Sequence, residues 1–297
     1  MPSWSGKTRG GLSGYKTIVF FIKHLGIPVT YFFLNFVVIY FLITSTKAVR
    51  SAKWYFRKIH KYSRFKAFFA VMKNYHVFGQ TLIDKIAVMS GNNKKLTFDF
   101  DGEDYLHNMA TDKSGAILMS GHIGSFEIAG YLLKRIDAEI NILMYEAEHE
   151  RIKNFLSNVY QDNQAKIITI KDDMSHVYEL KSVFENKEFL CLHGDRFVSE
   201  NKTITRPFMG YEARFPAGPF YLAMKNNIPV SFVFAMKEKK YHYHFYATPP
   251  VLFYEEKLNL KKREQQLANI VDQYIAAFEE ILKKYPTQWF NFYYFWE

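Results

Sequence analysis

The chain has 297 residues, enough for one large α/β domain or two small ones, and 48% of its residues are hydrophobic. Its single cysteine, Cys191, excludes an intrachain disulfide framework and a cysteine-rich metal site. The net charge of +10 is unevenly placed: residues 1–83 hold thirteen Lys and Arg and no acidic residue, whereas residues 84–297 hold 26 basic and 29 acidic residues. A basic arm on a near-neutral domain favours an anionic surface as partner.

The most apolar stretch of the chain, residues 27–44, lies in this arm and carries no charge. Its length approaches the roughly 20 residues that a membrane-spanning helix needs, although a buried helix of the fold is the alternative. Gly26 and Pro28 predict a helix start or break here, and both spanning and interfacial seating stay open. We assign residues 1–46 to a basic and hydrophobic membrane anchor and residues 47–90 to an amphipathic helical connector.

From residue 115 onward, short apolar runs alternate with amphipathic stretches. The alternation predicts an α/β domain over residues 91–297, with a largely parallel sheet flanked by helices. The loop before Pro216 is polar and contains Gly and Pro. The expected strands are 115–120, 140–145, 166–170, 189–193, 230–236 and 241–247. The expected helices are 125–136, 149–160, 174–186, 217–226 and 262–284.

His122 follows the first of these strands in a Gly-His-Ile-Gly turn that opens a helix. Ligands of open α/β sheets bind at the carboxyl ends of strands. Glu127 lies five residues later, where its carboxylate can approach the imidazole and hold it in one tautomer. On its own this spacing is weak, since a lone histidine is more often structural. With no serine elbow, and with Cys191 inside an apolar strand, the pair favours direct transfer: His122 deprotonates a hydroxyl or amine that attacks a thioester.

Two further segments are candidates for substrate binding. Gly194, Asp195 and Arg196 follow the strand 189–193; the Arg196 guanidinium suits phosphate or another anionic group, and Asp195 could orient it. A salt-bridged turn is the alternative there. The other segment, around Pro216, exposes the N-terminus of the predicted helix 217–226, which can bind an anion. The alternative is a plain helix start that binds no ligand. The candidate residues of this segment are Phe215, Pro216 and Gly218.

Together these segments resemble the lipid A biosynthesis late acyltransferases, the lauroyl/myristoyl-transferring family of Gram-negative bacteria, within the lysophospholipid acyltransferase-like superfamily. The resemblance rests on the N-terminal anchor, Ser120-Gly121-His122 with Glu127, the Gly194-Asp195-Arg196 segment, Phe215-Pro216-Ala217-Gly218 and the aromatic end from Gln288 to Trp296. It implies a glycerolipid acyltransferase-like fold, with His122 and Glu127 as the catalytic pair.

The resemblance also implies the reaction and its location. A fatty acyl chain passes from an acyl thioester, acyl carrier protein being the expected carrier, to a hydroxyl of a membrane-embedded glucosamine disaccharide, a lipid A precursor. No metal and no cofactor take part. The enzyme is expected in the inner membrane, with its catalytic domain on the cytoplasmic face and with lipid and membrane as partners.

Two departures from the family pattern leave the acceptor open. Typical members carry an arginine after the tyrosine of the second strand, where this chain has Tyr145-Glu146; Arg151 is the nearest cation and a further substrate-binding candidate. The chain also ends at Glu297 without the usual arginine-rich segment. Fewer cations fit a bis-phosphorylated acceptor less well, so an O- or N-acyltransferase for an amino-acid lipid or polyene is an alternative, as is CoA for the donor carrier.

A different class of protein is also compatible with the charge alone. A non-catalytic protein could use the basic arm to bind anionic membrane or nucleic acid. The aliphatic and aromatic bulk in the same segment, and the lack of any nucleic-acid motif, argue against nucleic acid. We therefore expect an enzyme with no nucleic-acid partner.

Overall fold

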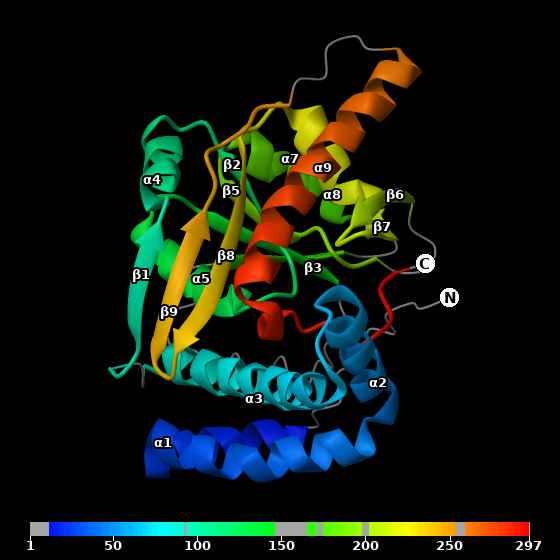
Figure 1. The fold of residues 1–297 in the computed structure, drawn as a ribbon. Coiled ribbons are helices and arrows are strands. Elements are labelled where there is room, and N and C mark those ends of the chain that lie inside the picture. Colours follow the sequence, from blue (N-terminus) through cyan, green and yellow to red (C-terminus); the bar gives the residue numbers. More distant parts are fainter. Residues whose placement is uncertain are drawn as a thin grey trace.

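The computed structural model describes residues 12–91, 94–145, 165–170, 175–197, 202–253 and 259–296. Its centre is a sheet with the strand order β1-β9-β8-β2-β5-β3-β4 (Figure 1). Strands β8, β2, β5, β3 and β4 are parallel, and β9 pairs antiparallel with β8. The predicted α/β class with a largely parallel sheet is confirmed. The bounds are β1 Thr97–Asp101, β2 Ala116–Ser120, β3 Ile140–Tyr145, β4 Ala165–Ile170, β5 Phe189–His193, β8 Val230–Lys239 and β9 His242–Ala247.

Helices cover both faces of this sheet because its buried strands are apolar on both sides. In β2, Leu118 packs in one core with helices α4, Glu103–Thr111, and α5, Phe126–Leu132. Met119 points to the other core, which contains α8 and α9. The helices of that second layer are α7 His176–Glu185, α8 Ala217–Asn226 and α9 Leu260–Lys284.

The N-terminal helices form a layer below one end of the sheet. They are α1 Leu12–Thr44, α2 Thr46–Trp54, the π-helical turn Tyr55–Ile59 and α3 Arg64–Met89. In Figure 1, α3 runs beneath the ends of β8 and β9, and α1 lies under α3. The arrowhead of β8 is at this end, so the carboxyl ends of the parallel strands face α3. Most of residues 47–90 are helical, with a break at 60–63, and the assignment of this segment as a connector stays a prediction.

Several predicted elements agree with the structure to the residue, among them β3, β5 and α8. The helix expected at 125–136 is shorter: α5 ends at Leu132, and a 3₁₀ turn, Leu133–Arg135, follows. The helix expected at 149–160 lies outside the described residues.

The expectation of a loop running to Pro216 is wrong. That segment contains an antiparallel hairpin of β6, Thr203–Phe208, and β7, Tyr211–Pro216. Met209 and Gly210 form its two-residue turn, with φ of 52° and 84°. Positive φ at both positions matches the turn that strand twist favours in hairpins. A methionine at such a position, and a proline inside β6, hide the hairpin from sequence patterns.

The alternation of strands and helices also begins earlier than residue 115. β1 is an edge strand whose Asp and Phe side chains alternate between solvent and the sheet face. Gly102, with φ of 82°, then turns the chain into α4, whose first turn carries Glu103 and Asp104. Acidic residues at a helix N-terminus are favourable because their negative charge lies next to the positive end of the helix dipole.

Candidate functional site

The turn between β2 and α5, which holds His122, is fixed by close approach of its backbone to neighbouring segments. A Cβ on Gly121 would lie 3.0 Å from the Tyr274 hydroxyl. Gly124 has φ of +62°, and a Cβ there would lie 2.1 Å from the carbonyl oxygen of Ala235. Gly124 therefore has to be a glycine, and a side chain at Gly121 would require the rings of α9 to shift. The sharp turn holds His122 at the carboxyl end of a buried strand, where ligand sites of α/β sheets form.

The C-terminal segment and α3 lock this turn from the side. The backbone N–H of Phe290 donates to the carbonyl oxygen of His122 at 2.9 Å. Asn74 of α3 donates through Nδ2 to the carbonyl oxygen of Trp289, also at 2.9 Å. Trp289 forms a β-bridge with Ile123. The histidine turn is thus connected to α3 through a single bridging segment.

His122 and Asp195 form the polar centre of the site. The two atoms His122 Nδ1 and Asp195 Oδ1 lie 2.7 Å apart, and the backbone N–H of His122 donates to Asp195 Oδ2 at 2.9 Å. An ionised carboxylate only accepts, so Nδ1 carries the hydrogen and Nε2 carries the lone pair of the neutral ring. The carboxylate therefore selects the tautomer in which Nε2 can take up a proton.

Asp195 is buried, with 1% of its surface exposed, yet its surroundings keep it ionised. Burial alone would raise the pKa of its carboxyl, but the charge and hydrogen bond of His122 and the charge of Arg196 lower it more, so the pKa lies well below its ordinary value. Trp289 Nε1 adds a longer contact of 3.4 Å to Oδ2. A fixed negative charge behind the imidazole stabilises the imidazolium that forms when Nε2 is protonated.

A second histidine, His193, packs edge-on against the first. The ring centroids of His193 and His122 are 4.4 Å apart, and the ring of Phe126 also contacts His193, with centroids 4.5 Å apart. Burial, followed by the charge of His122, lowers the pKa of His193 to about 3. His193 is therefore a neutral wall of the site near neutral pH.

Arg196 reaches from the end of β5 to the C-terminal segment. Its Nη2 donates to the carbonyl oxygen of Phe290 at 2.9 Å. Burial lowers the pKa of the guanidinium, and the charge of Asp195 acts in the opposite direction. Arg196 thus holds in place the C-terminal segment that is hydrogen-bonded to the His122 turn. Its predicted contact with substrate is a separate role.

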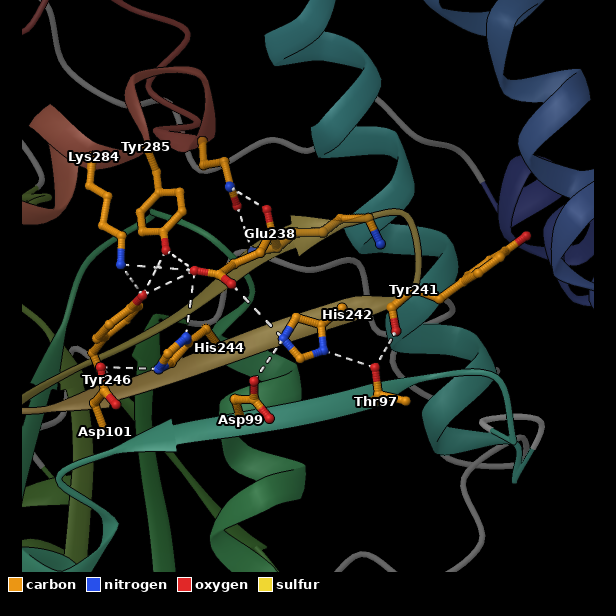
Figure 2. A network of polar contacts seen from close by, with 12 residues as sticks. Thr97, Asp99, Asp101, Glu238, Tyr241, His242, His244, Tyr246, Lys284 and Tyr285 are labelled. Atoms are coloured by element: carbon orange, nitrogen blue, oxygen red, sulfur yellow. Dashed lines mark hydrogen bonds and ion pairs between the residues drawn. The ribbon is translucent and has the colours of Figure 1, made fainter.

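A second cluster of titratable residues lies away from this site, at the β1–β9 edge (Figure 2). Glu238 of β8 lies 3.5 Å from His244 Nδ1 and accepts hydrogen bonds from Tyr246 and Tyr285. His244 Nε2 lies 3.1 Å from Asp101, and His242 pairs in the same way with Asp99. These charges pair with one another across strands. Among the residues that the structure describes, no group of three or more His, Cys, Asp or Glu could hold a metal ion.

Comparison with known proteins assigns the family. The profile described as bacterial lipid A biosynthesis acyltransferase matches residues 17–297. The chain belongs to this family. It is therefore an acyltransferase, as the sequence predicts.

The chain is also similar to solved structures. The 1-acyl-sn-glycerophosphate (LPA) acyltransferase PlsC from Thermotoga maritima is similar over 86% of this chain and 97% of its own, at 12% identity and a TM-score of 0.40. No curated protein sequence matches the chain significantly.

The remaining predicted site residues of this acyltransferase lie in three settings. Gly194 is packed into the core, where a Cβ would lie 3.0 Å from the Tyr274 ring, and its N–H donates to the carbonyl oxygen of Ser120. Phe215 is fully buried, and Pro216 caps α8, one residue before the helix begins. At Gly218, open space surrounds the position of a Cβ. Their substrate-binding roles stay predictions.

Two predicted residues cannot be placed beside His122. The Glu127 side chain lies outside the described residues, although its backbone belongs to the first turn of α5. Arg151 is outside them entirely. Among the described side chains, Asp195 contacts the imidazole at Nδ1. The catalytic role of Glu127 stays a prediction.

Sequence reasoning missed two contributors of this acyltransferase site. His193 precedes the predicted Gly194-Asp195-Arg196 segment, and its position at a strand end was a usable signal. Trp289 lies in the aromatic C-terminal segment, 94 residues from Asp195, and no local pattern connects the two.

Proposed function

We propose that this acyltransferase transfers a fatty acyl chain from an acyl thioester, carried by acyl carrier protein, to a hydroxyl group of a lipid A precursor. The observation that carries the proposal is the 2.7 Å contact between His122 Nδ1 and buried Asp195, at a strand end in a chain of this family. The pair supplies a general base at Nε2, which is what attack of a hydroxyl on a thioester requires.

The reaction uses His122 twice. Nε2 takes the proton of the acceptor hydroxyl while the hydroxyl oxygen forms a bond to the thioester carbonyl carbon. The tetrahedral intermediate then collapses, the carbon–sulfur bond breaks, and the thiolate takes the proton from the imidazolium. The products are an ester and a free thiol, and His122 returns to its starting state. No redox step occurs, because only a proton and an acyl group move.

Asp195 is a positioning residue in this scheme. It fixes the tautomer before attack and balances the imidazolium charge afterwards, while it remains ionised because His122 and Arg196 lower its pKa. Glu127, in the first turn of α5, is proposed to act on the acceptor side of the site. Arg196 and Arg151 are proposed to meet anionic groups of acceptor or donor.

The location follows from the acceptor. A lipid A precursor resides in a bilayer, and the apolar, basic N-terminal region is suited to reach it. We place the protein at the inner membrane with the catalytic domain on the cytoplasmic face, where acyl carrier protein is available.

The test is an acyl-transfer assay with purified full-length enzyme, acyl carrier protein thioesters and a lipid A precursor, with product detected by mass spectrometry. We expect transfer by the wild type and a loss of at least about 10² in kcat for His122→Ala. The matched control is His107→Ala, a half-exposed histidine on α4. Acylation of an amino-acid lipid instead of the lipid A precursor would overturn the acceptor, and an active, folded His122→Ala variant would overturn the mechanism.

A further inference from the structure

The apolar N-terminal helix α1 reverses its direction at Gly26. This glycine has φ of 77° and ψ of 170°, outside the helical range. The rings of Phe21 and Phe33 are in contact, with centroids 4.9 Å apart. In a straight helix twelve residues span about 18 Å, so this contact requires two arms that lie side by side. Residues 12–25 and 27–44 therefore form a helical hairpin (Figure 1).

The fold at Gly26 removes the single long helix that would cross a bilayer. By length and composition alone, Lys16–Thr44 is a candidate span. Folded at Gly26, however, its two arms are 14 and 18 residues long. At 1.5 Å per residue these are about 21 and 27 Å, against about 30 Å of hydrocarbon and roughly 20 residues per spanning helix. A hairpin also returns its second arm to the side on which the first one entered.

One face of the hairpin is held along α3. Leu34 packs onto Gly79, where a Cβ would lie 2.3 Å from Leu34 Cδ1. The Tyr31 hydroxyl donates to Asp84 Oδ1 at 2.5 Å, and Asp84 pairs with Lys237 of β8 at 2.6 Å. Asp84 and Lys237 are both buried, so turning the hairpin away from α3 would leave a buried ion pair without its third member. The hairpin therefore lies flat against the domain.

The opposite face is apolar and exposed, and it continues onto the first turns of α3. Ile43 is 71% exposed and Phe65 is 75% exposed. The other large members are Phe32, Phe36, Phe68 and Phe69. Exposed large apolar side chains in such number on α1 and the start of α3 are unusual for a soluble monomer. The surface is one layer from the site, because α3 contacts the Trp289 segment through Asn74.

Exposed cations border this apolar face. They lie on α2, on the π-helical turn, just before α3 and at its first residue, and no acidic residue precedes Asp84. These cations are Arg50, Lys53, Arg57, Lys58, Lys61 and Arg64. A band of positive charge beside an apolar face complements phosphate headgroups above hydrocarbon.

We propose that residues 12–44 form a monotopic hairpin that lies in one leaflet of an anionic membrane and that this segment does not cross the bilayer. The apolar face, including Phe65, contacts acyl chains, and the cations from Arg50 to Arg64 contact headgroups. His122 then lies on the same side as the leaflet that the hairpin enters. The proposal concerns seating alone, and only this last consequence rests on the proposed function.

The first test is topological. Gly14 and Thr46 are exposed and lie near the two ends of the hairpin. Gly14→Cys and Thr46→Cys, each in the full chain with Cys191→Ser, are treated with a membrane-impermeant maleimide in right-side-out and inverted vesicles. A hairpin predicts labelling of both positions in the same vesicle preparation. Labelling of the two positions in opposite preparations would show a spanning segment and overturn the proposal.

The second test asks what covers the apolar face. Phe65→Cys carries an environment-sensitive fluorophore, and the enzyme is reconstituted with brominated phospholipid. Quenching is expected at Phe65 and not at the matched control Tyr178→Cys, an exposed aromatic position on α7. Equally weak quenching at both positions would overturn the contact between the apolar face and lipid. That result is expected if a second copy of the chain covers the face. Acyl transfer is measured in parallel, so a wrong seating and a wrong reaction are distinguishable.

The third test concerns charge. Arg57→Gln/Lys58→Gln/Arg64→Gln is compared with Lys181→Gln/Lys225→Gln/Lys261→Gln, an equal charge change on α7, α8 and α9. Binding to phosphatidylglycerol-containing vesicles should weaken by about 10²-fold at low salt in the first variant, from roughly 1 kcal/mol per cation, and little in the second. Equal binding of both variants would overturn the headgroup assignment.

Discussion

The sharpest test of the site is Asp195→Asn. Asparagine keeps the shape of the side chain, and its Oδ1 can still accept from the backbone N–H of His122, as a carboxylate oxygen does at 2.9 Å. Its amide nitrogen, however, is a donor and would face Nδ1, which now lies 2.7 Å from a carboxylate oxygen. The imidazole would have to place its hydrogen on Nε2, so the nitrogen that should act as base would carry no lone pair.

The size of the effect follows from the exposure of His122. In a buried Ser-His-Asp triad, the same exchange costs about 10⁴ in kcat. Here the His122 side chain is 23% exposed, so water can partly replace the carboxylate in stabilising the imidazolium. We therefore expect a loss of about 10²–10³ in kcat, which corresponds to about 3–4 kcal/mol of transition-state stabilisation.

The assay is steady-state acyl transfer, with kcat and KM measured separately for donor and acceptor. Because Asp195 acts through His122, kcat should fall while both KM values stay near those of the wild type. ¹⁵N chemical shifts of the His122 ring report the tautomer directly. The matched control is Asp272→Asn on α9, a half-exposed carboxylate that pairs with Arg206 at 3.1 Å.

The reasoning would be refuted by a folded Asp195→Asn enzyme whose kcat is within threefold of wild type. It would also be refuted if the ¹⁵N shifts showed the same tautomer in both proteins. Thermal unfolding of the variant separates these outcomes from simple loss of structure.

Three further predictions concern pH and stability. His193, with its pKa lowered to about 3, should show no NMR titration between pH 5 and 8. The unfolded chain takes up this proton near pH 6.5 and the folded chain does not, so the free energy of unfolding should fall as the pH decreases from about 6.5 towards 3. This fall should be smaller in His193→Asn. A ring that titrates near 6.5 would contradict this. Gly124→Ala should destabilise the fold by at least about 1 kcal/mol in chemical denaturation, from its positive φ and its 2.1 Å approach to a carbonyl oxygen, whereas Gly130→Ala, with 3.8 Å of room, should not. Lys237→Met should lower the free energy of unfolding by about 3–5 kcal/mol, because it leaves Asp84 buried without its ion-pair partner. Adding Asp84→Leu to this variant should recover most of the lost stability. A double variant that recovers none of it would contradict the ion-pair account.

Local patterns were sufficient for most of the regular structure. Buried strands such as 140–145 and 189–193 are short apolar runs bounded by polar residues, and they were predictable to the residue. The hairpin of β6 and β7 was not predictable in this way. Its turn has positive φ at Met209 and Gly210, and only the glycine is a residue type that indicates such a turn. The edge strand β1 was missed because its alternating Asp and Phe lack the continuous apolar run of a central strand.

The N-terminal region shows where pattern and structure separate. Composition and charge are sufficient to predict an apolar segment in a basic arm, and Gly26 with Pro28 indicates a break. The direction of the chain after the break depends on docking, because Tyr31 and Leu34 find their partners on α3, 45 or more residues away. Hence the hairpin is a property of the tertiary structure.

The candidate site, too, was predictable from the sequence only in part. By itself the sequence determined that His122 stands at a strand end, in a glycine turn that suits catalysis, within a chain that resembles acyltransferases. It favoured nearby Glu127 as a partner of the imidazole, which stays a prediction, and it did not connect Asp195 to His122. Strands β2 and β5 are parallel neighbours with Ser120 opposite His193. That register brings His122 and Asp195, each two residues past its strand position, to 2.7 Å although 73 residues separate them. Strand order and register are set by packing over the whole sheet, so only the tertiary structure shows that Asp195 contacts the histidine.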